Sequence, residues 1–183
     1  MLFRSTYERG AEVLPHGGGM TVSNHLSYVD VLLIATRYPV VFVTSTEVRD
    51  GFALGPLCRL AGGAFVDRRS TSKLRTEIAA LARLMREGLH VVVFPEATST
   101  RGDRVLPFKA AMFEAVRMAE RPLWVARVSY PAAQLRTASY AGNDVFIGHL
   151  TGLLMAPRHT PTVTWLAADP VDRKSTRLNS SHT

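Results

Sequence analysis

The segment SNHLSYVD, Ser23–Asp30, places a histidine and an aspartate five positions apart. It follows the short apolar run Met20–Val22 and precedes the apolar run Val31–Ala35. This pattern predicts the end of a strand, a tight polar turn and a buried helix. Residues five apart on one helix are rotated by roughly 140° and face different directions. We therefore expect His25 in the turn and Asp30 in the first turn of the helix.

A histidine and an aspartate that meet in this way form a general base. The carboxylate of Asp30 would hold one nitrogen of the His25 ring and leave the other free to take a proton. Nothing nearby in the sequence is an obvious enzyme nucleophile. We infer that the nucleophile is a hydroxyl of the substrate.

Length and composition indicate one folded domain. The chain has 183 residues, of which 46% are hydrophobic and 20% charged, as in globular proteins. Cys58 is the only cysteine, which excludes an internal disulfide and a cysteine-rich zinc site. No apolar run approaches the roughly 18 residues of a membrane-spanning helix. The N-terminal stretch Met1–Ser5 is followed by charge, so we expect no signal peptide.

The formal net charge of +7 suits nucleic acid, anionic lipid or phosphorylated substrates, without choosing among them. Residues 172–183, DRKSTRLNSSHT, have no apolar periodicity and resemble the in-frame translation of a common sequencing adapter. We therefore assign residues 1–171 to the domain; a natural flexible basic tail is the alternative. Without residues 172–183, 19 basic and 14 acidic residues leave a charge of +5, so the body is still basic.

The apolar patterns predict an α/β fold. We expect helices at Ser70–Glu87 and Phe108–Met118, the first with apolar residues at helical spacing on one face. Predicted strands after Met20–Val22 are Pro39–Thr44, Gly62–Asp67, His90–Phe94, Leu123–Val128, Val145–Ile147 and Thr162–Leu166. Because strands alternate with helices, we predict a single layered domain with a largely parallel sheet flanked by helices.

Polar clusters follow three of these strands. They are the His25/Asp30 turn, Asp67–Arg69 and Pro95–Arg101. Ligands of α/β sheets gather outside the carboxyl ends of the strands, so we expect the three clusters to converge on one site. Within them, Arg68 and Arg69 can bind a phosphate through charge-assisted hydrogen bonds.

Glu96 in the third cluster has three possible roles on sequence alone. It can orient a substrate hydroxyl, hold Arg68, or cap the turn that follows it. A tetrahedral intermediate would also need hydrogen-bond donors, and backbone amides near Glu96 are candidates. Four other histidines lack a partner pattern, and we expect structural or surface roles for them: His16, His90, His149 and His159.

Three ordered motifs resemble those of the glycerolipid acyltransferases. They are Asn24-His25-x-Ser27-x-x-Asp30, then Gly63–Arg68, then Phe94–Thr98, and Arg127–Pro131 is weakly similar to the family's fourth motif. The similarity is greatest to the 1-acyl-glycerol-3-phosphate acyltransferases and covers residues 17–131. This resemblance implies a glycerol-3-phosphate acyltransferase-like fold.

The resemblance also implies a reaction. In that family the motif histidine deprotonates a substrate hydroxyl, which attacks the thioester of acyl-CoA or acyl carrier protein. By this resemblance His25 is the general base and Asp30 orients it. Arg68 is then an anion contact, and Glu96 and Thr98 contact the acceptor.

Further expectations follow from the resemblance. The acceptor is a lysolipid such as 1-acyl-glycerol-3-phosphate or lyso-ornithine lipid, and the pathway is membrane lipid biosynthesis. The protein is expected at the cytoplasmic face of the cell membrane, as a peripheral protein. Neither a metal nor a bound cofactor is implied, since acyl-CoA or acyl carrier protein is a substrate.

The chain departs from the family pattern at three places. Ala97 stands where the third motif usually has glycine, which costs about 1 kcal/mol if the turn needs a positive φ. Thr44–Glu47 lacks the lysine that many members carry, and Ala111 again replaces a glycine. These variants are more similar to the branch that acylates lyso-ornithine lipids and other lysolipids.

Two other functions are weighed against acyl transfer. Ala97 and Ser45 favour a non-catalytic lipid- or acyl-binding module with a degenerate site. The net charge alone suggests nucleic-acid binding. Because the basic residues are dispersed and no strand combines aromatic with basic residues, we expect no nucleic-acid partner.

Overall fold

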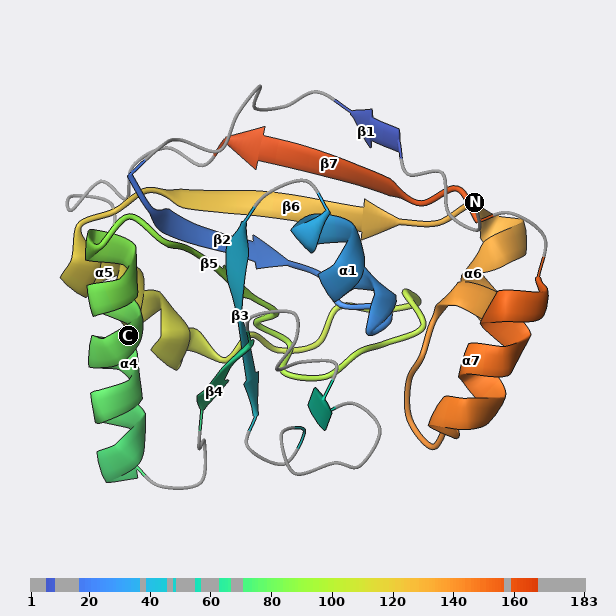
Figure 1. The fold of residues 1–183 in the computed structure, drawn as a ribbon, viewed down its shortest axis with the longest axis horizontal. Coiled ribbons are helices and arrows are strands. Elements are labelled where there is room, and N and C mark those ends of the chain that lie inside the picture. The colour runs from blue at the N-terminus through green and yellow to red at the C-terminus, as the bar shows by residue number, and fades with distance from the viewer. Residues whose placement is uncertain are drawn as a thin grey trace, which may run out of the picture.

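The computed structural model describes residues 6–8, 17–36, 39–45, 48, 55–56, 63–66, 71–156 and 159–167. Their strands form one seven-stranded sheet in the order β1-β7-β6-β2-β5-β3-β4 (Figure 1). The strands are β1 (Thr6–Glu8), β2 (Gly19–Ser23), β3 (Val40–Ser45), β4 (Gly63–Val66), β5 (His90–Val93), β6 (Leu123–Ser129) and β7 (Thr162–Ala167). Strands β2 to β6 are parallel, whereas β7 is antiparallel to β6 and parallel to β1.

Helices cover both faces of this sheet. They are α1 (Val29–Ala35), α4 (Thr71–Arg86), the 3-10 helix η1 (Ala110–Met112), α5 (Phe113–Ala119), α6 (Ala132–Ala138) and α7 (Phe146–Met155). Buried residues of α1, α6 and α7 form one apolar cluster with the strands, and those of α4, η1 and α5 form another. The predicted α/β layered domain with a largely parallel sheet is confirmed. No helix in the described ranges is long and apolar enough to cross a bilayer.

Strand β2 lies at the centre and delivers the SNHLSYVD turn to the edge of the sheet. It pairs with β5 on one side and β6 on the other, and all five of its residues are buried. The turn before it requires glycine, since Gly18 has a φ of 81° and an added Cβ would lie 2.2 Å from the Met85 carbonyl oxygen. The strand therefore starts at a close approach to the end of α4.

One predicted strand is wrong. Val145–Ile147 was predicted as a strand, but Val145 only precedes α7, whose first residues are Phe146 and Ile147. Three apolar residues in a row fit a strand and a buried helix equally well. Contacts with residues distant in the sequence favour the helix. Leu153 joins the core, and Phe146 packs against Tyr28 with ring centroids 5.1 Å apart.

Candidate active site

His25 and Asp30 meet at the carboxyl end of β2. Asp30 lies in the first turn of α1, and His25 lies in the turn before it. The His25 Nδ1 is 3.1 Å from the Asp30 Oδ2. Asp30 is fully buried, whereas the side chain of His25 is 19% exposed. The expected contact is present, and it leaves the His25 Nε2 as the second ring nitrogen.

The buried carboxylate of Asp30 is surrounded by donors. Its Oδ2 accepts hydrogen bonds from the backbone amides of Leu26, at 2.6 Å, and Ser27, at 2.9 Å. Its Oδ1 accepts one from the hydroxyl of Tyr130, at 3.3 Å. These bonds offset the cost of taking a carboxylate out of water. Asp30 is therefore fixed independently of His25.

Tyr130 stays a donor to that carboxylate. Burial and then the adjacent charge of Asp30 raise the pKa of Tyr130 far above its usual value. Its phenol therefore remains protonated at any pH at which the protein would work. Tyr130 was not among the predicted site residues, although it lies in the segment Arg127–Pro131 that weakly matched the family's fourth motif.

The ring of His25 is held by stacking as well as by Asp30. It lies parallel to the ring of Phe94, with centroids 4.0 Å apart and planes 17° apart. Phe94 directly follows β5, so the stack links the third polar cluster to the first. Asp30 at one edge of the imidazole and Phe94 on its face fix the orientation of the ring, as a general base would require.

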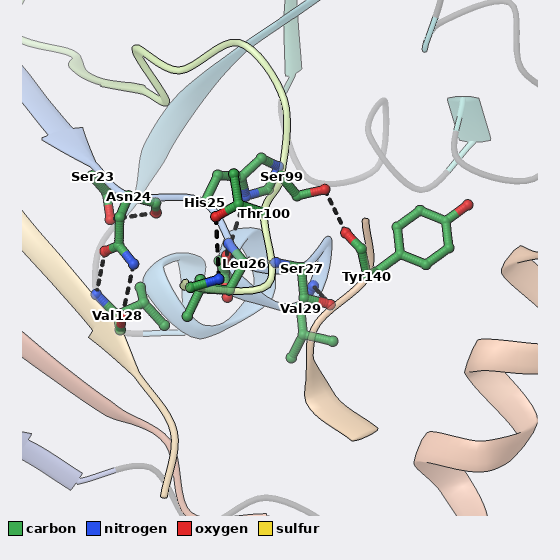
Figure 2. A network of polar contacts seen from close by, with 12 residues as sticks. Ser23, Asn24, His25, Leu26, Ser27, Val29, Ser99, Thr100, Val128 and Tyr140 are labelled. Carbon is green, nitrogen blue, oxygen red and sulfur yellow. Dashed lines mark hydrogen bonds and ion pairs between the residues drawn. The ribbon is translucent and has the colours of Figure 1, made fainter. Parts of the chain in front are cut away.

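The backbone of the turn is held from three sides, as Figure 2 shows. The side chain of Asn24 makes two hydrogen bonds with the backbone of Val128 on β6. The amide of Thr100 donates to the carbonyl oxygen of His25 at 2.9 Å, and the amide of Tyr140 to that of Leu26 at 2.8 Å. Sequence analysis missed these roles, because their partners lie far along the chain.

The other predicted site residues are placed as follows. Glu96 is buried, and its Oε2 accepts a hydrogen bond from the Leu106 amide at 2.9 Å, so it holds the loop that follows β5. Thr98 is exposed and lies in the same loop, two residues before the Thr100 that bonds His25. Arg68 and its neighbour Arg69 lie outside the described residues. The structure thus brings Glu96 and Thr98 to the segment that adjoins the His25 turn.

Ala97 adopts the left-handed backbone region, with a φ of 63°. Its amide donates to the Phe94 carbonyl oxygen at 3.0 Å, which closes a tight turn. An alanine in this region costs about 1 kcal/mol relative to glycine. The departure from the family motif therefore falls at a position where glycine would be the unstrained residue.

A cavity of about 550 Å³ lies beside the turn. Its walls come from Asn24 and Leu26 of the turn, from the loop that includes Glu96 and Arg104, and from β6 and Tyr130. The ring of His25 is not part of this lining. The walls combine apolar side chains with charged ones, which suits an amphipathic ligand.

His149 is tied to the same turn. Its Nδ1 lies 3.0 Å from the hydroxyl of Tyr28, and the two rings meet edge to face at a centroid distance of 5.4 Å. His149 lies on α7, so this contact packs α7 against the segment that holds His25. Among the residues that the structure describes, no group of three or more His, Cys, Asp or Glu side chains could hold a metal ion.

Comparison with known sequences gives consistent matches. The family described as Acyltransferase matches residues 6–132. A 1-acyl-sn-glycerol-3-phosphate acyltransferase from Neisseria gonorrhoeae is 33% identical over 140 residues, which are 75% of this chain and 55% of the relative. A lyso-ornithine lipid O-acyltransferase from Brucella abortus is 32% identical over 146 residues, which are 80% of this chain and 51% of the relative. The chain spans about half the length of the curated relatives it matches.

A solved structure shares the fold. The 1-acyl-sn-glycerophosphate acyltransferase from Thermotoga maritima matches with a TM-score of 0.63 and 19% identity, over 91% of this chain and 61% of that one. At this identity the likeness concerns the fold alone. It supports the same arrangement of a mostly parallel sheet with helices.

Proposed function

The chain belongs to the acyltransferase family, as its motifs indicated, and on this premise we propose that it transfers a fatty acyl group to the hydroxyl of a lysolipid. The observation that carries the proposal is the His25–Asp30 pair, with Asp30 buried and held by two backbone amides. A purely structural turn would not need a buried carboxylate beside a partly exposed imidazole. The relatives' names supply the class of acceptor.

The proposed mechanism has His25 as general base. Its Nε2 takes the proton of the acceptor hydroxyl as the oxygen attacks the thioester carbonyl of acyl-CoA or acyl carrier protein. The tetrahedral intermediate collapses, the new ester forms, and the carbon–sulfur bond breaks. The leaving thiolate takes the proton from the imidazolium. Asp30 keeps the proton on Nδ1 and stabilises the positive charge of the ring between these steps.

We assign acceptor contacts to Glu96, Thr98 and Arg68. Glu96 and Thr98 lie in the loop that bonds the His25 turn, whereas the assignment of Arg68 rests on its motif. The Ala97 amide is bonded to the Phe94 carbonyl, which removes it from the donors near Glu96 that could stabilise the oxyanion. The location we propose is the cytoplasmic face of the cell membrane.

The first test is acyl transfer from a labelled acyl-CoA and from acyl carrier protein to a panel of acceptors. The panel includes 1-acyl-glycerol-3-phosphate, lyso-ornithine lipid and other lysophospholipids. Transfer to one acceptor should be lost in His25→Ala, and Asp30→Asn should lower kcat by roughly a thousandfold or more. Glu87→Gln, a change of an exposed carboxylate directly after α4, serves as the control.

Two results would reject the enzyme. One is no transfer to any acceptor from either donor by folded protein. The other is undiminished transfer by His25→Ala. In the first case lipid binding that is indifferent to His25→Ala would identify a non-catalytic lipid- or acyl-binding module. The strained turn at Ala97 is the observation that favours this second candidate.

A further inference from the structure

Helix α7 exposes apolar side chains to solvent along one face. Ile147 is 61% exposed, Leu154 55% and Met155 86%. With Thr151 these residues follow the spacing i, i+4, i+7 and i+8, so they share one side of the helix. The opposite side is the buried one, because Leu153 joins the apolar cluster that covers the sheet. The outward side of α7 is therefore an apolar surface that no described residue of the chain covers.

No charged side chain interrupts this outward face. The sequence of α7, FIGHLTGLLM, contains no Asp, Glu, Lys or Arg. The one hydroxyl on the face, that of Thr151, donates back to the helix at 3.0 Å from the Ile147 oxygen and 2.9 Å from the Gly148 oxygen. Thr151 thus satisfies its hydroxyl within the helix. An exposed apolar surface of this kind marks an interaction site.

The neighbouring helix supplies a positive charge. Helix α6 packs beside α7, and its only charged residue is the exposed Arg136 in its last turn. An apolar helix face with a basic side chain on the adjacent helix complements the acyl region and the anionic headgroups of a lipid surface. A water-soluble protein partner would offer donors and acceptors for which this face has no counterpart.

The face adjoins the proposed catalytic turn. Figure 1 shows α6 and α7 side by side at the end of the sheet toward which the arrows of β2 and β6 point. Tyr28, three residues after His25, contacts Phe146 and His149 of α7. A surface that touched α7 would therefore lie close to the place where the acceptor reacts.

We propose that the outward face of α7, formed by Ile147, Thr151, Leu154 and Met155, docks on a lipid bilayer that contains anionic lipids. The inference rests on the proposed function, since a lysolipid acceptor resides in such a bilayer. It names the surface by which the chain reaches its substrate. It also explains why a helix this apolar is left uncovered on one side.

The test is cosedimentation with vesicles of an equal mixture of phosphatidylcholine and phosphatidylglycerol. The triple variant Ile147→Gln/Leu154→Gln/Met155→Gln should weaken binding by roughly tenfold or more. Arg136→Gln should weaken binding to these vesicles more than to vesicles of phosphatidylcholine alone. The matched control is Leu89→Gln/Met118→Gln, which removes exposed apolar side chains near α4 and α5 and should bind as the wild type does.

Three outcomes would overturn the inference. The first is a wild-type chain that does not sediment with vesicles, and the second is a triple variant that binds as the wild type does. The third is a wild type that forms dimers while the triple variant is a monomer. The last outcome would assign the face to a second copy. Circular dichroism of each variant checks that α7 still folds. Vesicle binding needs no turnover, so vesicle binding without acyl transfer would reject the proposed function and leave this inference standing.

Discussion

The side-chain amide of Asn24 takes the place of a strand residue beside Val128. Its Nδ2 donates to the Val128 carbonyl oxygen at 2.9 Å, and its Oδ1 accepts from the Val128 amide at 2.8 Å. The pairing of β2 with β6 ends one residue earlier, at Ser23 and Ala126. The chain can therefore leave the sheet at Asn24 while the buried backbone groups of Val128 on β6 stay hydrogen-bonded.

Asn24→Asp keeps the shape of the side chain but should disrupt this pair of hydrogen bonds. A carboxylate oxygen would face the Val128 carbonyl, so one hydrogen bond is lost and a repulsion is added. We expect the free energy of unfolding in urea to fall by about 1–3 kcal/mol, and kcat to fall with it as His25 shifts. Asn143→Asp, in an exposed loop, is the matched control. An Asn24→Asp chain with unchanged stability would contradict the role of this pair.

Tyr130→Phe isolates the donor on the far side of Asp30. The ring stays in place while the hydroxyl, 3.3 Å from the Asp30 Oδ1, is removed. Loss of one hydrogen bond worth about 1 kcal/mol predicts a drop in kcat of about fivefold, with an unchanged KM for the acceptor. Tyr140→Phe is the control, since Tyr140 bonds the turn through its backbone amide and its ring contact with Tyr28 does not need the hydroxyl.

A double-mutant cycle decides whether Tyr130 acts through His25. In the His25→Ala background, Tyr130→Phe should cause no further loss of residual activity. Equal losses in both backgrounds would show that the hydroxyl contributes only to general stability.

Ala97→Gly should stabilise the protein. The backbone at Ala97 has a φ of 63°, where glycine is unstrained and alanine is not. We expect the free energy of unfolding to rise by about 0.5–1 kcal/mol. Ala133→Gly in the exposed part of α6 should have the opposite effect, a loss of about 1 kcal/mol. Equal destabilisation by both changes would mean that position 97 is not strained.

His90 should make the fold sensitive to acid. Burial lowers the pKa of His90 to about 4, and its Nε2 lies 2.6 Å from the Thr21 hydroxyl oxygen. The unfolded chain takes up a proton near pH 6.5, whereas the folded chain does so only near pH 4. Stability is therefore fully present above pH 6.5 and falls as the pH drops toward 4, by up to about 3 kcal/mol.

The variant His90→Gln tests this dependence. It cannot take up a proton, so its free energy of unfolding should depend less on pH over the same interval. The difference in the free energy of unfolding between wild type and variant should become smaller as the pH falls from 7 to 4. Parallel curves for the two proteins would contradict the assignment to His90.

Local patterns in the sequence determined most of the elements and the first contact of the site. Helical spacing of apolar residues predicted α4 at Ser70–Glu87, where the structure has Thr71–Arg86. The meeting of His25 and Asp30 followed from helix geometry, because they are only five positions apart. Both are short-range relationships, which the spacing of residues along the chain specifies directly.

Tertiary structure decided what lies across the sheet. Asn24 and Val128 are 104 residues apart, and Asp30 and Tyr130 are 100 apart, so their contacts depend on the strand order that places β6 beside β2. The periodicity of single segments does not encode that order. The same limit made the apolar residues that begin α7 look like a strand, since packing against Tyr28 and the core selects the helix. The contact of His25 with Asp30 was thus determined locally, and the scaffold that holds the pair was determined only by the fold.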